Sequence, residues 1–175
     1  MKTVFFAASS LDGYIADKNN SLDWLFQFGE PKNNYIENFV ETIGALAMGS
    51  TTYQWMLDNL PEGSAWPYKV PTFVFTHRKF PSFPNADIRF VSGDVRPVHQ
   101  QMSQEAQGKN LWIVGGGELV GKFYDAHLLD ELIIQFASVT LGEGAPLLPR
   151  KLEKPLKLQS VTRIDEEFVE LRYLV

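Results

Sequence analysis

The chain of 175 residues contains no cysteine and only three histidines. Without cysteine it has no disulfide bonds, no thiolate nucleophile and no zinc site built on cysteine, which fits a reducing cytoplasm. The histidines, His77, His99 and His127, are too widely spaced to form the H-x-x-x-H or H-E-x-x-H patterns of metal sites. The G-x-S-x-G elbow of many serine hydrolases is also absent. We therefore expect neither a metal centre nor a serine hydrolase.

Long apolar runs and an excess of basic residues are missing as well. No stretch reaches the roughly 20 apolar residues that a membrane-spanning helix needs. The apolar run at the start ends at Ala8, which is too short for a secretory signal peptide, so we expect a first β-strand and a cytoplasmic location. The formal net charge of −5 argues against a nucleic-acid surface. It does not argue against one small phosphorylated ligand.

The remaining composition is that of one globular domain, with 45% hydrophobic and 21% charged residues and no repeat or linker. We therefore expect a single domain over residues 1–175. Early strand patterns alternate with amphipathic helix patterns, which indicates a parallel sheet with crossover helices and an antiparallel pair at the end. The predicted strands cover residues 2–9, 44–48, 72–76 (the clearest central strand), 88–91, 111–114, 131–139, 156–161 and 168–174. Four helices are predicted. The first is capped by Asn33 or Asn34 and has Ile43 on its apolar face, and the others begin after residues 49–52, after Asp94 and after Gly117.

Two of these strands run into glycines that open a helix. Leu111–Val114 leads into Gly115, Gly116 and Gly117, and residues 44–48 lead into Gly49 and a row of hydroxyls, Ser50, Thr51 and Thr52. Glycine lets a backbone approach a ligand closely, and a helix start directs unpaired N–H groups at an anion. Two interpretations remain for each junction: a phosphate cradle, or simply a sharp turn or a helix cap.

A Rossmann dinucleotide site does not fit the first junction. Its glycines are spaced G-x-G-x-x-x-G, and the next strand ends near Gln135–Ser138 without an acidic residue for a ribose hydroxyl. The strand at 72–76 delivers His77, Arg78 and Lys79, which either face solvent or grip a phosphate. In a parallel sheet the loops at 49–52, 76–79, 92–94 and 115–118 would meet at one edge, where ligands bind.

Five motifs stand in an order that resembles the dihydrofolate reductase-like superfamily. The chain is most similar to the reductase domain of the riboflavin-pathway deaminase-reductase and its stand-alone relatives, over nearly its whole length. The motifs are Ser10–Ala16, Met48–Tyr53, Thr76–Arg78, Val114–Glu118 and Leu141–Leu147.

The resemblance implies an α/β three-layer fold. A mainly parallel eight-stranded sheet, with an antiparallel C-terminal edge and helices on both faces, would bind NADPH in extended form, and relatives pair into homodimers. By the same resemblance, Ala8 and Ile15 would flank the nicotinamide. The central phosphates would contact Gly49, Ser50, Thr51 and Thr52 and the backbone of Gly115, Gly116, Gly117, Glu118 and Leu119. Thr76 and Arg78, beside His77, would hold the 2′-phosphate, and Ser92 and Gly93 would lie near the adenosine end. Arg78 favours NADP over NAD because its planar fork pairs with phosphate oxygens.

Fewer residues are predicted to contact the substrate than the cofactor. Substrate would stack near Trp24, Leu25, Phe28 and Tyr53 and accept a hydride, while the protein supplies orientation and a proton route. Folate-reducing enzymes place an acid a few residues after such a tryptophan, and the nearest carboxylate here is Glu30.

Asp12 and Glu143 are the other candidate acids. The alternative for Asp12 is the turn residue that Asp usually is before a Gly such as Gly13. Glu143 lies in a Gly-Glu-Gly loop that faces either solvent or the pocket. The expected function is that of an NADPH-dependent reductase of a small heterocyclic or carbonyl substrate, resembling 5-amino-6-(5-phosphoribosylamino)uracil reductase. The alternatives are dihydrofolate reductase proper and a non-catalytic NADP(H)-binding module.

Overall fold

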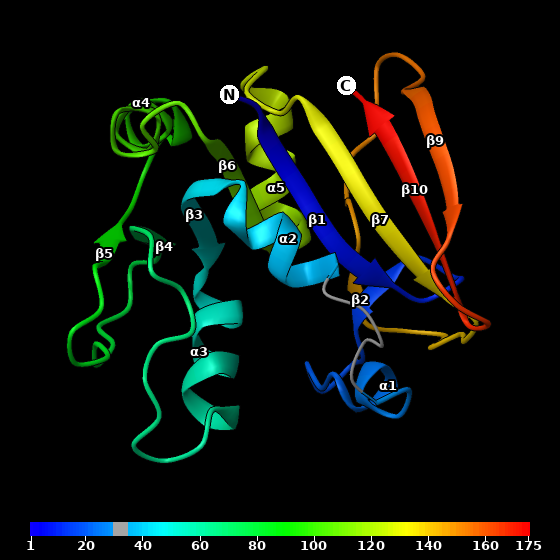
Figure 1. The fold of residues 1–175 in the computed structure, drawn as a ribbon, viewed down its shortest axis with the longest axis horizontal. Helices are drawn as coiled ribbons and strands as arrows, with labels where there is room; N and C mark the ends of the chain where they lie inside the picture. Colours follow the sequence, from blue (N-terminus) through cyan, green and yellow to red (C-terminus); the bar gives the residue numbers. More distant parts are fainter. Residues whose placement is uncertain (30–34) are drawn as a thin grey trace.

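The computed structural model describes residues 1–29 and 35–175 and contains one eight-stranded sheet in the order β5-β4-β3-β6-β1-β7-β10-β9 (Figure 1). The strands are β1 (Thr3–Ser9), β2 (Tyr14–Ala16), β3 (Ile43–Gly49), β4 (Thr72–Phe75), β5 (Ile88–Val91), β6 (Asn110–Gly115), β7 (Glu131–Ala137), β8 (Ala145–Pro146), β9 (Lys157–Arg163) and β10 (Phe168–Leu174). The helices are α1 (Asp23–Phe26), α2 (Tyr35–Glu41), α3 (Ser50–Asn59), α4 (Val95–Glu105) and α5 (Gly117–Asp125).

The sheet is parallel from β5 to β7; β10 pairs antiparallel with β7, and β9 pairs antiparallel with β10. β2 and β8 form a separate two-stranded ribbon. The crossover helices connect the parallel strands, whereas the last two strands form the hairpin predicted from their alternating pattern. The predicted mainly parallel sheet with an antiparallel C-terminal edge is confirmed.

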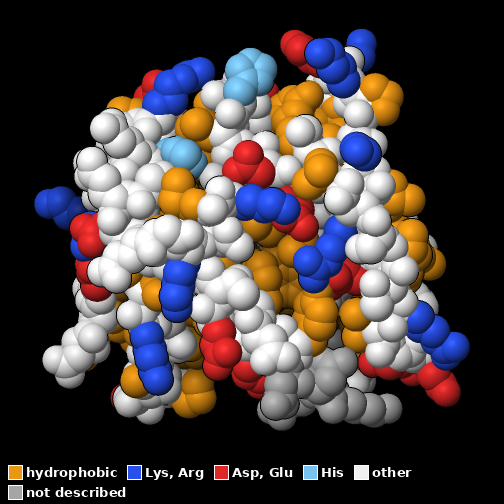
Figure 2. All heavy atoms as spheres, turned by 45° about the horizontal axis from the view of Figure 1, so that its top comes forward, with side chains coloured by type: hydrophobic (Ala, Val, Ile, Leu, Met, Phe, Trp, Pro, Cys, Tyr) orange, Lys and Arg blue, Asp and Glu red, His pale blue; other side chains and the backbone are white. Residues whose placement is uncertain are grey.

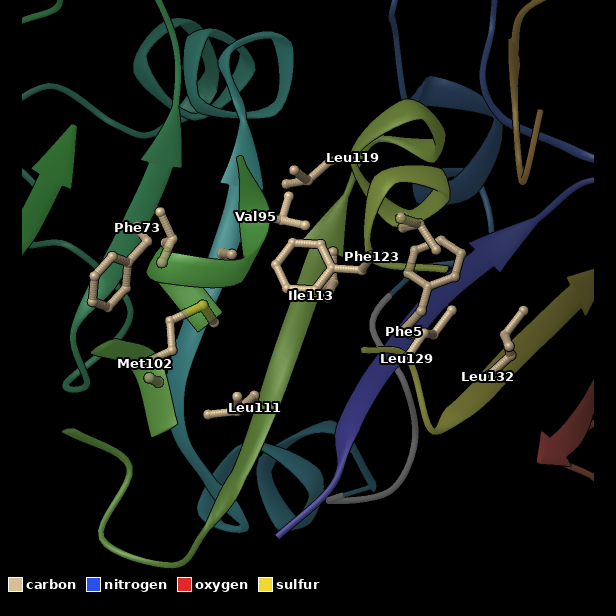
Figure 3. Packing of buried hydrophobic residues seen from close by; sticks show 14 of the residues in the cluster. Phe5, Phe73, Val95, Met102, Leu111, Ile113, Leu119, Phe123, Leu129 and Leu132 are labelled. Carbon is tan, nitrogen blue, oxygen red and sulfur yellow. The ribbon is translucent and has the colours of Figure 1, made fainter. Parts of the chain in front are cut away.

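Helices cover both faces of the sheet, as Figure 1 shows, so the molecule has three layers. One apolar cluster lies between the sheet and helices α4 and α5 and includes the fully buried side chains of Phe5, Ile113 and Phe123 (Figure 3). The other lies between the sheet and helices α2 and α3 and includes Phe6 and Trp112. Each large side chain that leaves water in these clusters contributes roughly 1.5–3 kcal/mol.

The alternation along β1 defines two faces of the sheet. Phe5 packs on the α4/α5 face, while Val4 and Phe6 pack on the α2/α3 face. Because successive side chains of a strand point to opposite faces, Ala8 also lies on the α2/α3 face. Unlike Phe5, Ala8 is partly exposed, because it lies near the carboxyl end of its strand.

Two details of the sequence prediction were wrong. Residues 72–76 were expected to form the central strand, but β4 is second from the edge and ends at Phe75. Its side chains are nevertheless buried, because helices cover both faces even there. Ile43 was placed on a helix, but it begins β3 and is 1% exposed. The predicted helix cap at Asn33 or Asn34 lies outside the described residues.

The surface carries a mixture of charges. On the face shown in Figure 2, Lys and Arg side chains are scattered among acidic ones and do not gather into a basic patch. Within residues 1–29 and 35–175, no helix is long and apolar enough to cross a membrane. Strand β9 is an edge strand with exposed Leu158 and Val161, and the expected homodimer stays a prediction.

One histidine of the α4/α5 layer is held against the sheet. The imidazole Nε2 of His99 lies 2.8 Å from Thr3 Oγ1, and the Thr3 backbone N–H donates to Asp130 Oδ2 at 2.7 Å. Burial lowers the pKa of His99, although the Asp130 charge opposes the effect. The folded protein therefore disfavours the imidazolium form.

This lowered pKa predicts a pH dependence of stability. As pH falls below the unfolded-state value of about 6.5, the unfolded chain binds the proton before the folded protein does, so stability decreases. The stability that neutral His99 contributes is fully present above that pH and is lost as pH falls through the pKa of His99 in the folded protein. The free energy of unfolding, measured with urea at about pH 7.5 and at about pH 5, should therefore decrease less between the two pH values in His99→Gln than in wild type. The exposed His77→Gln variant is the control, and equal losses in wild type and His99→Gln would contradict the assignment.

Candidate functional site

The two predicted glycine junctions meet at the carboxyl edge of the sheet, where β3 and β6 are neighbours. A Cβ atom added to Gly49 would lie 3.7 Å from the Gly116 nitrogen and 3.8 Å from the Gly115 oxygen. One added to Gly115 would lie 3.2 Å from Thr52 Oγ1. The structure therefore brings the junctions into direct contact, and we call Gly49–Thr52 and Gly115–Glu118 the glycine clasp.

Both helices of the glycine clasp begin without a side-chain cap. Gly49 is the N-cap of α3 and Gly116 is the N-cap of α5, and neither end has a side-chain capping bond. By contrast, Asp94 caps α4 and accepts a hydrogen bond from the Arg96 backbone N–H. First-turn N–H groups need partners outside the helix, and the glycine clasp brings the uncapped starts of two helices to one place, which is the arrangement that suits an anion.

The acidic residue in the first turn of α5 is neutralised. Glu118 pairs with Arg150 at 3.0 Å, and Arg150 also pairs with Asp125 at 2.9 Å. The Glu118 side chain thus engages a cation, which leaves its backbone N–H for the glycine clasp. Leu119 does not fit its predicted role, because its N–H already donates to Gly116 O at 3.0 Å and its side chain is buried in the core.

The predicted nicotinamide residues lie beside the glycine clasp. A Cβ on Gly116 would be 4.0 Å from Ile15 Cδ1, and Ala8 lies on β1, the neighbour of β6. Both residues are partly exposed. Ala8 and Ile15, predicted to lie at the same cofactor ring, are therefore both close to the glycine clasp.

The residues predicted for the other end of the cofactor follow β4 and β5, on the opposite side of β3. Thr76 Oγ1 accepts the Arg78 backbone N–H at 2.8 Å, and the exposed Arg78 guanidinium lies over the Phe80 ring, 4.7 Å from its centroid. His77 and Ser92 are exposed. A cavity of about 220 Å³ opens beside them and is lined by Gly93, Asp94, Val95, Arg96, Lys122, Asp125 and Ala126.

Helix α1 and the residues directly after it, where substrate contacts were predicted, pack against both α3 and β10. Phe26 stacks on Trp55 of α3 at 5.9 Å between ring centroids, and Phe28 meets Phe168 of β10 edge-on at 5.0 Å. Trp24 is 8% exposed, and its indole N–H is buried without a partner among the described residues. A buried donor without a partner costs about 1–3 kcal/mol. Leu25 is partly buried, and its role stays a prediction.

The prediction for Tyr53 was wrong. Its side chain is fully buried, and its hydroxyl donates to the Pro81 carbonyl at 2.8 Å. The ring packs against Trp66, Phe80 and Phe90 in the core. No surface of Tyr53 is left for stacking on a substrate.

The structure also removes two of the three candidate acids. Asp12 accepts hydrogen bonds from the Ser10 hydroxyl at 2.6 Å, from the Leu141 N–H at 3.0 Å and from the Gly142 N–H at 2.7 Å. The Ser10 hydroxyl, together with these backbone donors, lowers the pKa of Asp12, so the carboxylate stays ionised and joins two loops. Glu143 forms a surface ion pair with Lys18 at 2.8 Å, and both side chains are about 65% exposed. Glu30 lies outside the described residues.

Sequence reasoning missed a buried polar cluster on the α2/α3 face. Glu170 of β10 is 2% exposed and accepts hydrogen bonds from the Tyr35 hydroxyl, Gln135 Nε2 and Arg172 Nε. Burial, followed by the Glu170 carboxylate, raises the pKa of Tyr35 to about 12. The available signal was the pattern Phe168-x-Glu170-x-Arg172, which places a charge pair on one face of a strand in the core sheet.

The role of Asp12 as a loop clamp gives a direct test. In Asp12→Ala the Leu141 and Gly142 N–H groups lose their acceptor, so their hydrogen exchange should accelerate. The matched control, Glu143→Gln, removes only an exposed ion pair and should leave both rates unchanged. Site-resolved amide exchange by NMR measures this, and unchanged rates in Asp12→Ala would show that the carboxylate does not hold the loops together.

Comparison with known proteins agrees with this geometry. A family model of the RibD C-terminal domain matches residues 2–169. The uncharacterized protein YwjB of Bacillus subtilis (strain 168) is 35% identical over 176 residues, which cover 99% of this chain and 97% of YwjB.

Solved structures share the fold. A protein from Shewanella sp. PV-4, named for riboflavin biosynthesis, is 29% identical with a TM-score of 0.77, over 99% of this chain and 98% of its own. Dihydrofolate reductase from Enterococcus faecalis, solved with NADP(H), is 16% identical with a TM-score of 0.61, over 99% of this chain and 95% of its own. The chain belongs to the RibD C-terminal domain family and has its dihydrofolate reductase-like three-layer fold.

Proposed function

We propose that this chain is an NADPH-dependent reductase that transfers a hydride to a small heterocyclic or carbonyl substrate. The observation that carries the proposal is the glycine clasp, in which Gly49 and Gly116 bring two uncapped helix starts together. Membership of the RibD C-terminal domain family and the likeness to a reductase solved with NADP(H) support it.

The proposed cofactor runs along the carboxyl edge of the sheet. Its central phosphates accept hydrogen bonds from the N–H groups of the glycine clasp and from Ser50, Thr51 and Thr52. Its adenosine end lies at Ser92, Gly93 and the adjoining cavity, with Thr76 and Arg78 at the 2′-phosphate. Arg150 removes the repulsion that Glu118 would otherwise exert on a phosphate.

The substrate lies beyond Ala8, on the side of β7 and β10. When bound, the nicotinamide cofactor supplies the hydride, and the protein supplies orientation and exclusion of water. Ala8 leaves space for a ring because its side chain is one methyl group. Helix α1, with Trp24, and the residues directly after it, with Phe28, cover the same region.

Gly49→Ala tests the glycine clasp. The Gly49 backbone (φ −81°, ψ 166°) suits any residue, and an added methyl meets only ordinary contacts, so the melting temperature should not change. The methyl does occupy the space in which a phosphate approaches, so NADPH affinity should fall at least about tenfold. Calorimetric titration measures the affinity, and unchanged binding by the folded variant would exclude the clasp as the phosphate site.

Arg78→Ala tests the choice between NADPH and NADH. Loss of a charged hydrogen bond to the 2′-phosphate should weaken NADPH by about 1.5–3 kcal/mol and leave NADH unchanged. Lys79→Ala, at the neighbouring position, is the control and should change the affinity for neither NADPH nor NADH by much. Equal affinities of the wild type for both cofactors, measured by nicotinamide fluorescence, would refute the role of Arg78.

Turnover is tested with NADPH and two substrates. Oxidation of NADPH by 5-amino-6-(5-phosphoribosylamino)uracil would support a riboflavin-type reductase, and oxidation by dihydrofolate would support a dihydrofolate reductase. Binding of NADPH without oxidation by either, or by a panel of small carbonyl compounds, would instead indicate a cofactor-binding module.

A further inference from the structure

We propose that Gln135 is a specificity-determining residue of the substrate site, held by Glu170 so that its carbonyl oxygen selects substrates with an N–H donor. The inference rests on the proposed function, because it takes Ala8 as the place of the nicotinamide. It adds the recognition group on the substrate side, where neither Asp12 nor Glu143 acts.

Strand register places Gln135 next to Ala8. Ala8 of β1 pairs with Gln135 of β7, and Gln135 pairs with Glu170 of β10. Paired residues of neighbouring strands point to the same face, so the three side chains form a row across the sheet. Ile133, two residues before Gln135, packs in the cluster beneath α2 and α3, so the row lies on the α2/α3 face.

The row extends away from the phosphates. The glycine clasp follows β3 and β6 on one side of β1, whereas Gln135 and Glu170 lie on the two strands on the other side. A nicotinamide that reaches Ala8 from the clasp thus has Gln135 beyond it. Gln135 is partly exposed while Glu170 is 2% exposed, so a ligand can contact the amide and not the carboxylate behind it.

Glu170 is fixed by groups from three elements. The Tyr35 hydroxyl of α2 donates to its Oε1 at 2.6 Å, Arg172 Nε donates to Oε1 at 2.8 Å, and Gln135 Nε2 donates to Oε2 at 3.1 Å. Arg172 also donates to the Tyr35 hydroxyl and lies 3.8 Å from Glu131 Oε1. A buried carboxylate is stable only with such partners, which keeps its position well defined.

This carboxylate determines which way the Gln135 amide points. A carboxylate can only accept hydrogen bonds, so the NH₂ end of Gln135 must face Glu170. The carbonyl oxygen Oε1 then faces away, and no donor of residues 1–29 or 35–175 reaches it. Gln135 therefore presents a fixed acceptor beside Ala8.

A fixed acceptor in these surroundings discriminates between substrates. Two residues from Glu170 toward the carboxyl edge, on the same face of β10, Phe168 packs on Phe28, so an apolar ring pair borders the Gln135 amide on that side. A substrate N–H would pair with Oε1, whereas an N-methyl group would leave Oε1 dry and unpaired. Sites that hydrogen-bond a substrate N–H reject analogues without it for this reason.

The test uses uracil, which has two ring N–H groups, and 1,3-dimethyluracil, which has none. Both are titrated by ¹H–¹⁵N NMR into the full-length protein saturated with NADP⁺. Uracil should bind at least about tenfold more tightly than the dimethyl compound and should shift the Gln135 side-chain amide signals. In Gln135→Leu the preference for uracil should disappear while NADP⁺ affinity stays at the wild-type value.

The variant Glu170→Gln tests whether the orientation of the Gln135 amide matters, and not only its presence. The new NH₂ group would oppose that of Gln135 and turn its amide over, so the preference for uracil should be lost although Gln135 is retained. Gln100→Leu, at an exposed position of α4, is the matched control and should keep the preference. If Gln135→Leu does not fold, as judged by thermal melting, Gln135→Met keeps the side-chain length and replaces it.

The outcomes separate this inference from the proposed function. Failure of NADP⁺ to bind would overturn the proposed function, and the uracil preference would then be measured on the free protein. Equal binding of the two probes, no binding of either to the wild type, or a preference that survives in Gln135→Leu would overturn the role of Gln135, even where NADP⁺ binds.

Discussion

The site depends on one close backbone contact, between Gly49 at the end of β3 and Gly115–Gly116 at the end of β6. Helices α3 and α5 lie on opposite faces of the sheet, and their starts meet only because no side chain stands between them. This contact divides the carboxyl edge into two halves. The half that follows β4 and β5 carries the hydroxyl of Thr76 and the guanidinium of Arg78. The half on β1, β7 and β10 carries the row of Ala8, Gln135 and Glu170.

Local sequence patterns predicted most elements because apolar runs, glycines and caps act over a few residues. They could not give the strand order, which follows from the crossovers, so residues 72–76 looked central although β4 is second from the edge. Ile43 was misassigned because a β-branched residue between a helix and a strand fits both patterns. Both glycine junctions could be located from sequence, because a glycine between an apolar run and a helix pattern marks the turn directly, but their contact with each other could not.

The acids could not be resolved from sequence because their partners are distant. Asp12 meets an N–H group 129 positions away, and Tyr35 meets Glu170 across 135 positions. A turn residue and a catalytic acid look alike until those partners are known. For the same reason the pairing of Gln135 with Glu170 could not be predicted, since the pattern around Glu170 indicates a buried charge but does not name its partner on β7.

The contacts of Asp12 join the loop after β1 to the loop after β7. Besides these hydrogen bonds, a Cβ on Gly144 would lie only 2.1 Å from Ala16 O, so the two loops also touch through bare backbone. They are consequently one mechanical unit, although they come from opposite ends of the chain. Any displacement of Ile15 relative to Gly116 must therefore either carry both loops together or first break the Asp12 bonds and the pairing of β2 with β8.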